Sequence, residues 1–252
     1  MEQIHEQIIT RHRQEPKRRA LNVTEVSHLT PHMIRVQLSG EELKDFKSLS
    51  PDDHIKLFFE TGAGKPEMRD YTPRAYDNDA CTLTLDFAVH EAGPATAWAL
   101  SAKPGDTLNI GGPRGSAVVA PVFDWYLLIG DETALPAIGR RVEELPAGVE
   151  VITLTGVPEA ADEQVFETAA THHAHWIHRP VEEATDPEPM LEALKGITWP
   201  AGKGFVWIAA EAKVARVLRD YVTGEIGHPS HWMKASGYWT QGVADGSDKH
   251  LA

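Results

Sequence analysis

The stretch Thr82-Leu-Thr-Leu-Asp-Phe-Ala-Val89 decides the first half of the fold. Every second residue from Leu83 to Val89 is apolar, which is the period of two expected of a strand with one buried face. Several short strands at this spacing predict an antiparallel barrel. The other segments with the same pattern are 23–26, 33–38, 55–59 and 107–110. Residues 91–102 interrupt the strands and are expected to form a helix, with Pro94 in its first turn.

The pattern changes at Phe123, where strands begin to alternate with helices. This alternation predicts a parallel α/β sheet. We therefore expect an N-terminal arm over residues 1–16, a β-barrel over 17–122, and an α/β domain with a C-terminal tail over 123–252. The expected strands of the second domain are 125–129, 149–154 and 205–209, and the expected helices are 136–145 and 214–221.

Composition excludes several classes of protein. The net charge of the 252 residues is −13, which argues against nucleic acid as a partner. Apolar runs are short, as in residues 125–129, so no membrane span is expected. The first ten residues are polar and do not resemble a secretory leader. The single cysteine, Cys81, excludes an internal disulfide and is expected to be a small buried side chain. A cytoplasmic protein is expected.

Other motifs do not support a site. Gly64-Lys65 lacks the upstream glycine and the following Ser or Thr of a phosphate loop, and no dinucleotide fingerprint follows a strand. The histidine-rich segment 172–178 is interpreted as a polar surface loop, and no metal site is predicted. The basic run from Arg11 to Arg19 is interpreted as a solvated arm.

The segment Arg69-Asp-Tyr-Thr-Pro-Arg74 suits a flat, anionic cofactor. Arg69 can pair with a phosphate, Tyr71 can lie against a ring system, and Thr72 can hydrogen-bond the edge of a ring. On its own, the segment is explained equally well as an edge strand with two surface arginines that ends in a proline turn.

A second motif strengthens the cofactor interpretation. His90 ends a predicted strand, and Gly93-Pro94-Ala95-Thr96 then opens a helix. Free backbone N–H groups and the positive end of a helix form an anion site, and small residues allow a pyrophosphate to approach. An ordinary capped helix is the alternative.

Three turns complete the set of motifs. They are Gly111-Gly-Pro-Arg-Gly-Ser116, the loop Gly130-Asp-Glu-Thr-Ala-Leu-Pro136 after the first strand of the second domain, and Gly237-Tyr-Trp239 preceded by Lys234. In open α/β sheets ligands bind beyond the carboxyl ends of strands, so the loop after Gly130 is expected to face the cleft between the domains.

Seven motifs in this order resemble the siderophore-interacting protein family, FAD-dependent ferric-siderophore reductases related to the ferredoxin-reductase superfamily. The resemblance extends from about residue 17 to residue 239. It implies a six-stranded antiparallel FAD-binding barrel followed by a parallel α/β NAD(P)H-binding domain. The matching segments are 52–59, 69–73, His90 with 93–95, 112–116, 131–137, 211–213 and 237–239.

The resemblance also implies roles for individual residues. The positions that match the family's FAD contacts are Arg69, Tyr71, Thr72, Phe87, His90, Gly93, Pro94, Ala95 and Thr96. Those that match the flavin border and the nicotinamide entry are Asp131, Glu132, Thr133, Glu211, Lys213 and Trp239. Three cations, Lys56, Arg114 and Lys234, match positions that surround the ferric chelate. Local cations are needed because a net charge of −13 repels an anionic chelate.

The activity implied is hydride transfer from NADPH or NADH to FAD, followed by single-electron reduction of the Fe(III)-siderophore and release of Fe(II). The short tail after Trp239 resembles the NADPH branch, and ferredoxin is an alternative partner. The siderophore is expected to be an anionic catecholate or hydroxamate. The flavin carries the chemistry, so no residue is assigned as a general acid or base. Two other functions remain open: a flavin or ferredoxin-type reductase with another acceptor, and a non-catalytic siderophore-binding protein.

Overall fold

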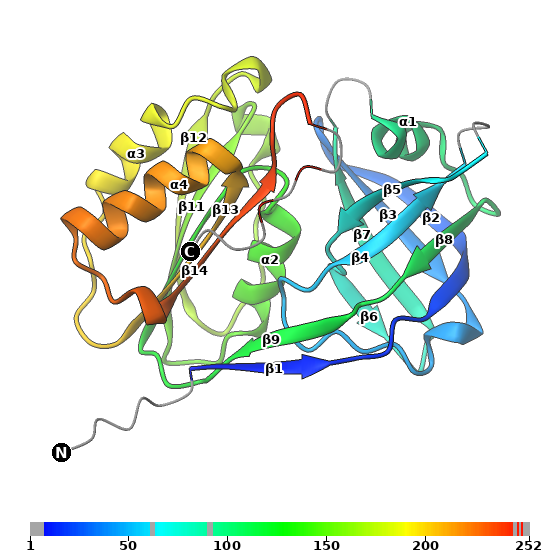
Figure 1. The fold of residues 1–252 in the computed structure, drawn as a ribbon, viewed down its shortest axis with the longest axis horizontal. Helices are drawn as coiled ribbons and strands as arrows, with labels where there is room; N and C mark the ends of the chain where they lie inside the picture. The colour runs from blue at the N-terminus through cyan, green and yellow to red at the C-terminus, as the bar shows by residue number, and fades with distance from the viewer. Residues whose placement is uncertain (1–7, 61–63, 90–92, 244–245, 247, 249–252) are drawn as a thin grey trace.

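The computed structural model describes residues 8–60, 64–89, 93–243, 246 and 248, and two lobes lie side by side in it (Figure 1). The first lobe is a curled antiparallel sheet with strand order β5-β4-β8-β2-β3-β7-β6. Its strands are β2 (Arg18–Thr30), β3 (Met33–Ser39), β4 (Ile55–Phe59), β5 (Glu67–Tyr71), β6 (Ala75–Asp77), β7 (Thr82–Ala88) and β8 (Thr107–Gly111). Helix α1 (Pro94–Ser101) packs on this sheet.

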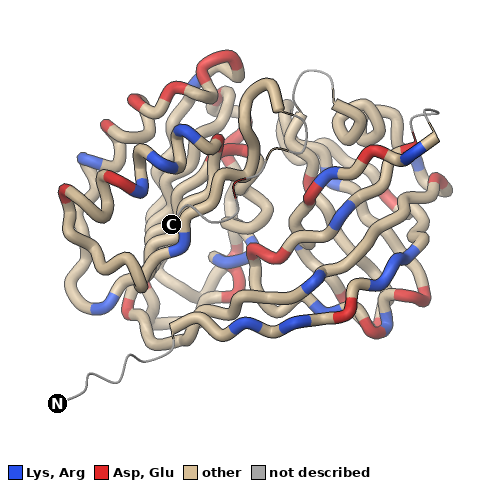
Figure 2. Tube along the Cα trace, in the orientation of Figure 1, with Lys and Arg blue, Asp and Glu red and all other residues tan. Residues whose placement is uncertain are grey.

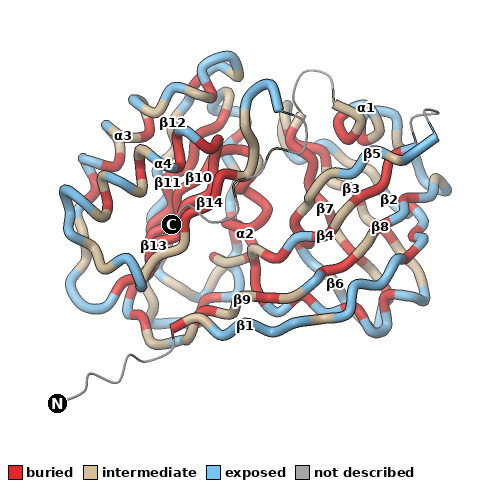
Figure 3. The backbone as a smooth tube through the Cα atoms, viewed as in Figure 1, coloured by how far each residue is buried: buried red, intermediate tan, exposed pale blue. Residues whose placement is uncertain are grey.

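The second lobe is a parallel sheet with strand order β12-β11-β10-β13-β14. Its strands are β10 (Trp125–Gly130), β11 (Glu150–Val157), β12 (Thr171–His178), β13 (Gly204–Glu211) and β14 (Met233–Trp239). Helices α3 (Glu188–Lys195) and α4 (Ala212–Asp220) lie on one face, and α2 (Leu135–Glu144) lies on the face toward the first lobe (Figure 1). The central strands are buried throughout, as a parallel sheet covered on both faces requires (Figure 3).

The predicted fold class is confirmed, with one difference in strand number. The antiparallel sheet has seven strands rather than six, because the three-residue β6 adds to its edge by pairing with β7. Cys81 is buried as predicted.

Two predictions about segments are wrong. The histidine-rich segment is the edge strand β12, paired with β11 from Thr171 to His178, rather than a loop. The basic run is solvated at Arg11, Arg13, Lys17 and Arg18, as predicted, but it is not an unpaired arm: β1 (Ile9–Arg13) pairs with β9 (Gly115–Val119), and the Arg19 side chain is buried against Phe46.

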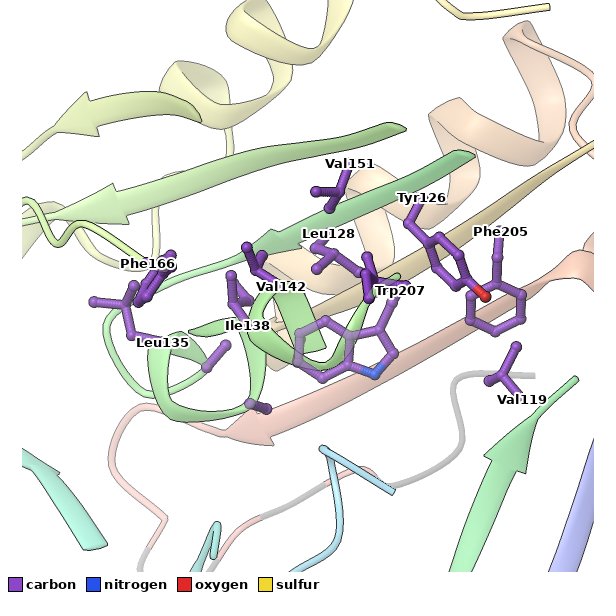
Figure 4. Packing of buried hydrophobic residues seen from close by; sticks show 14 of the residues in the cluster. Val119, Tyr126, Leu128, Leu135, Ile138, Val142, Val151, Phe166, Phe205 and Trp207 are labelled. Atoms are coloured by element: carbon purple, nitrogen blue, oxygen red, sulfur yellow. The ribbon is translucent and has the colours of Figure 1, made fainter. Parts of the chain in front are cut away.

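One hydrophobic cluster joins the two lobes. Ile138 and Val142 of α2 pack with Leu128 of β10 and Trp207 of β13 (Figure 4). The same cluster includes apolar residues that precede the second lobe in the sequence, namely Ile8, Met33, Ala88 and Val119. The contact between the lobes is therefore part of a continuous core, which holds the site between them in a fixed geometry.

Helix α4 begins where the sequence places an acidic residue. The carboxylate of Glu211 accepts hydrogen bonds from the backbone N–H groups of Lys213 at 2.6 Å and Val214 at 3.2 Å. These groups have no partner inside the helix, so Glu211 serves as its N-cap.

Candidate functional site

An aromatic surface lies inside the first lobe. The rings of Tyr71 and Phe87 have centroids 4.5 Å apart, and Phe87 is 5.6 Å from Trp98 of α1. Burial raises the pKa of the Tyr71 phenol, so the hydroxyl stays neutral. The strands β5 and β7 that carry these rings lie apart in the sheet order, and the curl of the sheet brings them together. A planar ring system can stack against such a surface.

The start of α1 has the features of an anion site. Gly93 is its N-cap residue, no described side chain caps the first turn, and Pro94 follows. A Cβ added to Gly93 would meet no described atom within 4 Å, so the described residues leave open space at this point. Ala95 and Thr96 are buried against the sheet. The exposed backbone N–H groups and the positive helix end favour a phosphate here.

Arg69 and Thr72 flank Tyr71. The Arg69 guanidinium donates to the carbonyl of Met68 at 2.8 Å and to Glu67 at 2.8 Å, and Thr72 is buried. His90 lies outside the described residues. The aromatic surface, the arginine and the open space at Gly93 fit a dinucleotide with a flat ring, as FAD is.

Asp131 connects three strands at the carboxyl edge of the second sheet. Its carboxylate accepts from Thr133, from the backbone N–H of Glu211 at 2.9 Å and from the indole N–H of Trp239 at 2.8 Å. Four residues of the predicted nicotinamide border are therefore brought together by direct contacts. Asp131 fixes the ends of β10, β13 and β14 relative to one another.

Glu132 and Glu211 are held by protein partners. Glu132 accepts from the guanidinium of Arg179 at 2.7 Å, and both side chains are almost fully buried. Sequence reasoning missed Arg179, which follows β12; recognising that strand would have placed it at the ligand-binding edge. Glu211 caps α4, and Lys213 is exposed.

The three predicted chelate cations lie on elements that adjoin one another. Lys56 of β4 is in register with Gly111 of β8, three residues before Arg114. A Cβ on Gly112 would lie 3.9 Å from the backbone of His54, so this turn packs beside the start of β4. Lys234 of β14 reaches the loop before β4 through an ion pair with Asp52.

Each lysine has a carboxylate partner. Lys56 Nζ lies 3.1 Å from Asp70 Oδ1, and Lys234 pairs with Asp52, which also accepts from Ser50 at 2.6 Å and from the indole of Trp207 at 3.3 Å. Arg114 is exposed, and no described carboxylate is within ion-pair distance of it. Sequence reasoning assigned no role to Asp52 or Asp70, although both stand inside the motifs it used.

Tyr238 of β14 lies near carboxylates of both lobes. Its pKa is raised well above the usual value, first by burial and then by repulsion from the carboxylates of Asp52, Asp53, Asp131 and Asp70. These carboxylates come from β5, from the loop before β4 and from the end of β10, so Tyr238 lies among them. A small pocket beside Asp52 is lined in part by Arg141 and Trp207.

Hydrogen bonds and ion pairs join the lobes on another side of their contact. Arg140 of α2 donates to the Ser48 hydroxyl and carbonyl, both at 2.7 Å, and to the carbonyl of Pro73 at 3.0 Å. Arg74 pairs with Glu143 at 2.7 Å, and His32 pairs with Asp162 at 2.7 Å.

Family models matched to the two parts of the chain belong to the same family. Residues 123–242 match the family model described as siderophore-interacting protein. Residues 22–67 and 60–117 match the model of the siderophore-interacting FAD-binding domain.

Individual relatives cover nearly the whole chain. The NADPH-dependent ferric-chelate reductase of Escherichia coli is 33% identical over 88% of this chain and 92% of its own. The ferric vibriobactin reductase ViuB of Vibrio cholerae is 27% identical, with 89% and 90% covered. The crystal structure of a siderophore utilization protein from T. fusca superposes with a TM-score of 0.89 at 35% identity, covering 95% of this chain and 99% of that one.

Proposed function

The chain belongs to the siderophore-interacting protein family, and from this premise we propose that it is an NADPH-dependent ferric-siderophore reductase that binds FAD. The observation that carries the proposal is the joint presence, in the first lobe, of the Tyr71–Phe87 aromatic pair and the open helix start at Gly93. Together they fit the flat ring and the pyrophosphate of the cofactor.

Residues of the first lobe hold the cofactor in this proposal. Tyr71 would lie against the flavin ring, and the Thr72 hydroxyl would hydrogen-bond the edge of that ring. Arg69 would pair with a phosphate and give up one of its present contacts to do so. The start of α1 receives the pyrophosphate, with Phe87 behind Tyr71. When bound, FAD supplies hydride acceptance from the nicotinamide and electron transfer to ferric iron. The full set assigned to the cofactor is Arg69, Tyr71, Thr72, Phe87, His90, Gly93, Pro94, Ala95 and Thr96.

Residues of the second lobe shape the side of the site that receives the nicotinamide, the electron donor. Asp131 holds Trp239 and Thr133 at the carboxyl edge of the sheet, next to the first lobe. Glu132 and Glu211 keep that edge in place through Arg179 and the cap of α4. We assign the nicotinamide entry to this edge.

The iron chelate is the substrate, and the three cations Lys56, Arg114 and Lys234 surround it in the proposal. Hard oxygen ligands bind Fe(III) strongly and Fe(II) weakly, so reduction releases the metal. None of the helices in the described part of the chain combines the length and the apolar character that a bilayer crossing requires. We place the reaction in the cytoplasm, where the nicotinamide donor is regenerated.

The first test is a visible spectrum of the purified protein, followed by anaerobic titration with NADPH. We expect a yellow protein whose absorbance bleaches, and we expect Fe(II) to appear in a ferrous-specific dye when a ferric siderophore is added. A colourless protein that does not take up FAD contradicts the proposal. Bleaching with transfer to free flavin, quinone or ferredoxin, but not to ferric chelates, indicates a reductase with another acceptor. Chelate binding without flavin indicates a carrier.

The second test is a pair of variants at Tyr71. Tyr71→Ala removes the stacked ring, so we expect the Kd for FAD to rise about tenfold or more. Tyr71→Phe retains the ring and is the matched control, with an expected change within about twofold because the hydroxyl is not needed for stacking. Equal Kd values for all three proteins would remove Tyr71 from the cofactor site.

A further inference from the structure

A histidine and two carboxylates meet where the lobes adjoin, on segments to which no cofactor or chelate role has been assigned. His32 lies in the turn between β2 and β3 of the first lobe. Glu159 precedes, and Asp162 ends, a short 3-10 helix (Ala160–Asp162) that follows β11 of the second lobe. Each of the three side chains offers one metal-ligating atom, and these atoms all lie within 4.8 Å of one another.

Asp162 is held against the first lobe by both of its oxygens. Oδ1 accepts from the backbone N–H of His32 at 2.9 Å, and Oδ2 lies 2.7 Å from Nδ1 of the His32 ring. The Asp162 side chain is only 3% exposed. The carbonyl of His32 in turn accepts from the backbone N–H of Val89 at 2.9 Å, which ties the turn to the end of β7. The imidazole and this carboxylate are therefore fixed relative to one another.

The carboxylate of Glu159 is exposed and, among the described residues, makes no hydrogen bond or ion pair. It nevertheless lies beside the carboxylate of Asp162, and two like charges at this distance repel. A protonated His32 offers one positive charge against two negative ones, so the three side chains together carry at least one negative charge. A divalent cation between them balances both carboxylates.

The donor atoms indicate the class of ion. One imidazole nitrogen with carboxylate oxygens suits divalent transition metals such as zinc, whereas magnesium takes oxygen ligands and water. Zinc bonds to nitrogen and oxygen are about 2.0–2.2 Å long, so donors that share an ion lie about 3–3.5 Å apart. The 2.7 Å between His32 and Asp162 has to widen only slightly. Rotation of the exposed Glu159 side chain brings in the third donor.

Two buried polar atoms stand close to these ligands in the sequence. The Thr30 hydroxyl is two residues before His32, and the Gln164 amide nitrogen is two residues after Asp162. Neither atom has a hydrogen-bond partner among the described residues. Buried polar atoms normally have one, so both have bonding capacity to spare. A metal ion with three protein ligands keeps water in its remaining positions, and such water bonds to hydroxyl and amide groups.

We propose that His32, Glu159 and Asp162 form a binding site for one divalent transition-metal ion, which links the two lobes. The ion takes the place of the proton between His32 Nδ1 and Asp162, and that proton passes to the solvent. The role of the ion is structural, because it is held by both lobes at once. The inference does not rest on the proposed function, since neither flavin nor iron chelate takes part in it.

The test is a calorimetric titration of the full chain, dialysed against EDTA and then freed of the chelator, with zinc chloride or magnesium chloride. We expect one zinc ion to bind with a Kd of about 1 μM or tighter. Magnesium should bind at least about a hundredfold more weakly, because it is a poor partner for imidazole. Zinc should also raise the Tm of the wild-type protein, because it binds the folded state.

The variant Glu159→Gln carries the test, because Glu159 is exposed and its replacement leaves the buried contact of Asp162 intact. We expect the Kd for zinc to rise at least about tenfold in this variant and in His32→Asn, since even groups that only support a metal ligand cost about that much when they are removed. The rise in Tm should shrink in parallel. Circular dichroism verifies that each variant is folded.

His178→Asn is the matched control. His178 Nε2 lies 2.8 Å from the carboxylate of Glu163, so this pair resembles that of His32 and Asp162. Its side chains are 43% and 40% exposed, and the pair belongs to no group of three ligands in the described part of the chain. The chain has 13 histidines, and weak zinc binding to exposed ones is expected. His178→Asn should therefore leave the tight binding step unchanged.

The outcomes decide between an ion site and an ordinary ion pair. A wild-type Kd for zinc above about 100 μM, or magnesium bound as tightly as zinc, overturns the inference. So does a folded Glu159→Gln variant that binds zinc as the wild-type protein does, or a loss of tight binding in His178→Asn. None of these results bears on reduction of ferric chelates, which the spectrum and the NADPH titration test separately.

Discussion

Two groups of polar contacts lie where the lobes meet, and they differ in burial. On the α2 side, Arg140 is buried and all its contacts are with protein atoms of the other lobe or its own helix. On the β14 side, Lys234 and Lys56 are about one quarter exposed. Figure 2 shows basic and acidic segments close together along the side of the molecule where β4 and β14 run.

The difference indicates two uses for the same chemistry. A buried arginine whose three nitrogens all donate to protein acceptors fixes one arrangement of the lobes, because any other arrangement leaves charge without a partner in a dry environment. A partly exposed pair tolerates water and ligand, so its main effect is on the local electrostatic potential. The α2 side therefore sets the geometry of the cleft, and the β14 side sets its charge.

The largest expected effect comes from Arg140→Ala. The change removes the donors to the Ser48 carbonyl and hydroxyl and to the Pro73 carbonyl, which then remain buried without this partner. We expect the free energy of unfolding to fall by about 3–5 kcal/mol, measured by urea denaturation.

Arg216→Ala is the control for this change. Arg216 pairs with Asp248, and both side chains are more than 40% exposed, so the expected loss is below about 1 kcal/mol. Similar losses in the two variants would remove the distinction between the buried and the exposed sides.

A smaller effect is expected from Asp131→Asn. The amide retains one acceptor oxygen but cannot serve Thr133, the Glu211 backbone and Trp239 together. We expect a loss of about 2 kcal/mol in unfolding free energy and a change in the near-UV circular dichroism of Trp239. Asp220→Asn, at an exposed carboxylate, should change neither. An unaltered Trp239 signal would show that the carboxyl edge does not depend on Asp131.

Asp52 and Asp53 should respond to pH with opposite signs. The pKa of Asp52 is lowered, so its stabilising contribution is present above about pH 4 and is lost as the pH falls through the lowered pKa. The pKa of Asp53 is raised by burial, which outweighs hydrogen bonds from Ser116, Ser50 and Ser48, so its ionised form costs stability at neutral pH. Asp52→Asn should therefore cost about 1 kcal/mol at pH 7 and less at pH 3.

Urea unfolding of both variants between pH 7 and pH 3 checks this prediction. Relative to Asp53→Asn, the wild-type protein should gain stability as the pH falls. The same direction of change for both variants would contradict the assignment of Lys234 as the partner that keeps Asp52 ionised.

The smallest expected effect comes from two histidines that take part in neither group of contacts. The pKa of His172 is lowered by burial and by His173, and that of His228 is lowered by burial. Their unfolded forms take up protons first, so unfolding free energy should fall as the pH drops below about 6.5. A His172→Asn, His228→Asn double variant should show a flatter profile between pH 7 and pH 5. If the unfolding free energy of the double variant changes with pH as steeply as that of the wild-type protein, other groups cause the pH dependence.

The fold was predictable where one face of an element is apolar. Strand β4 and the buried strands β10 and β13 lie where alternation or apolar runs predict them, within a few residues. Strand β12 was not predictable, because its sequence Thr-His-His-Ala-His-Trp-Ile-His lacks both patterns and its position at the sheet edge leaves much of it exposed. Strand β1 was not predictable for the same reason. It pairs with one strand only, so most of its side chains, including the basic ones, are exposed.

The site was predictable as a set of residues but not as a charge distribution. The Asp52–Lys234 pair joins positions 182 apart, and no local pattern reveals such a contact. The role of Glu211 as a helix cap is readable only once the start of α4 is known. Tyr71 and Phe87 are neighbours because the sheet curls, which depends on the pairing of all its strands.

The hydrophobic cluster around α2 has a consequence for how this protein can be divided. Ile8, Met33, Ala88 and Val119 belong to that cluster together with Leu128 and Phe205. Cutting the gene near codon 122 would leave each half with an exposed hydrophobic surface, and neither half should express well alone. Recombination or engineered domain exchange should therefore succeed only when both halves travel as one module.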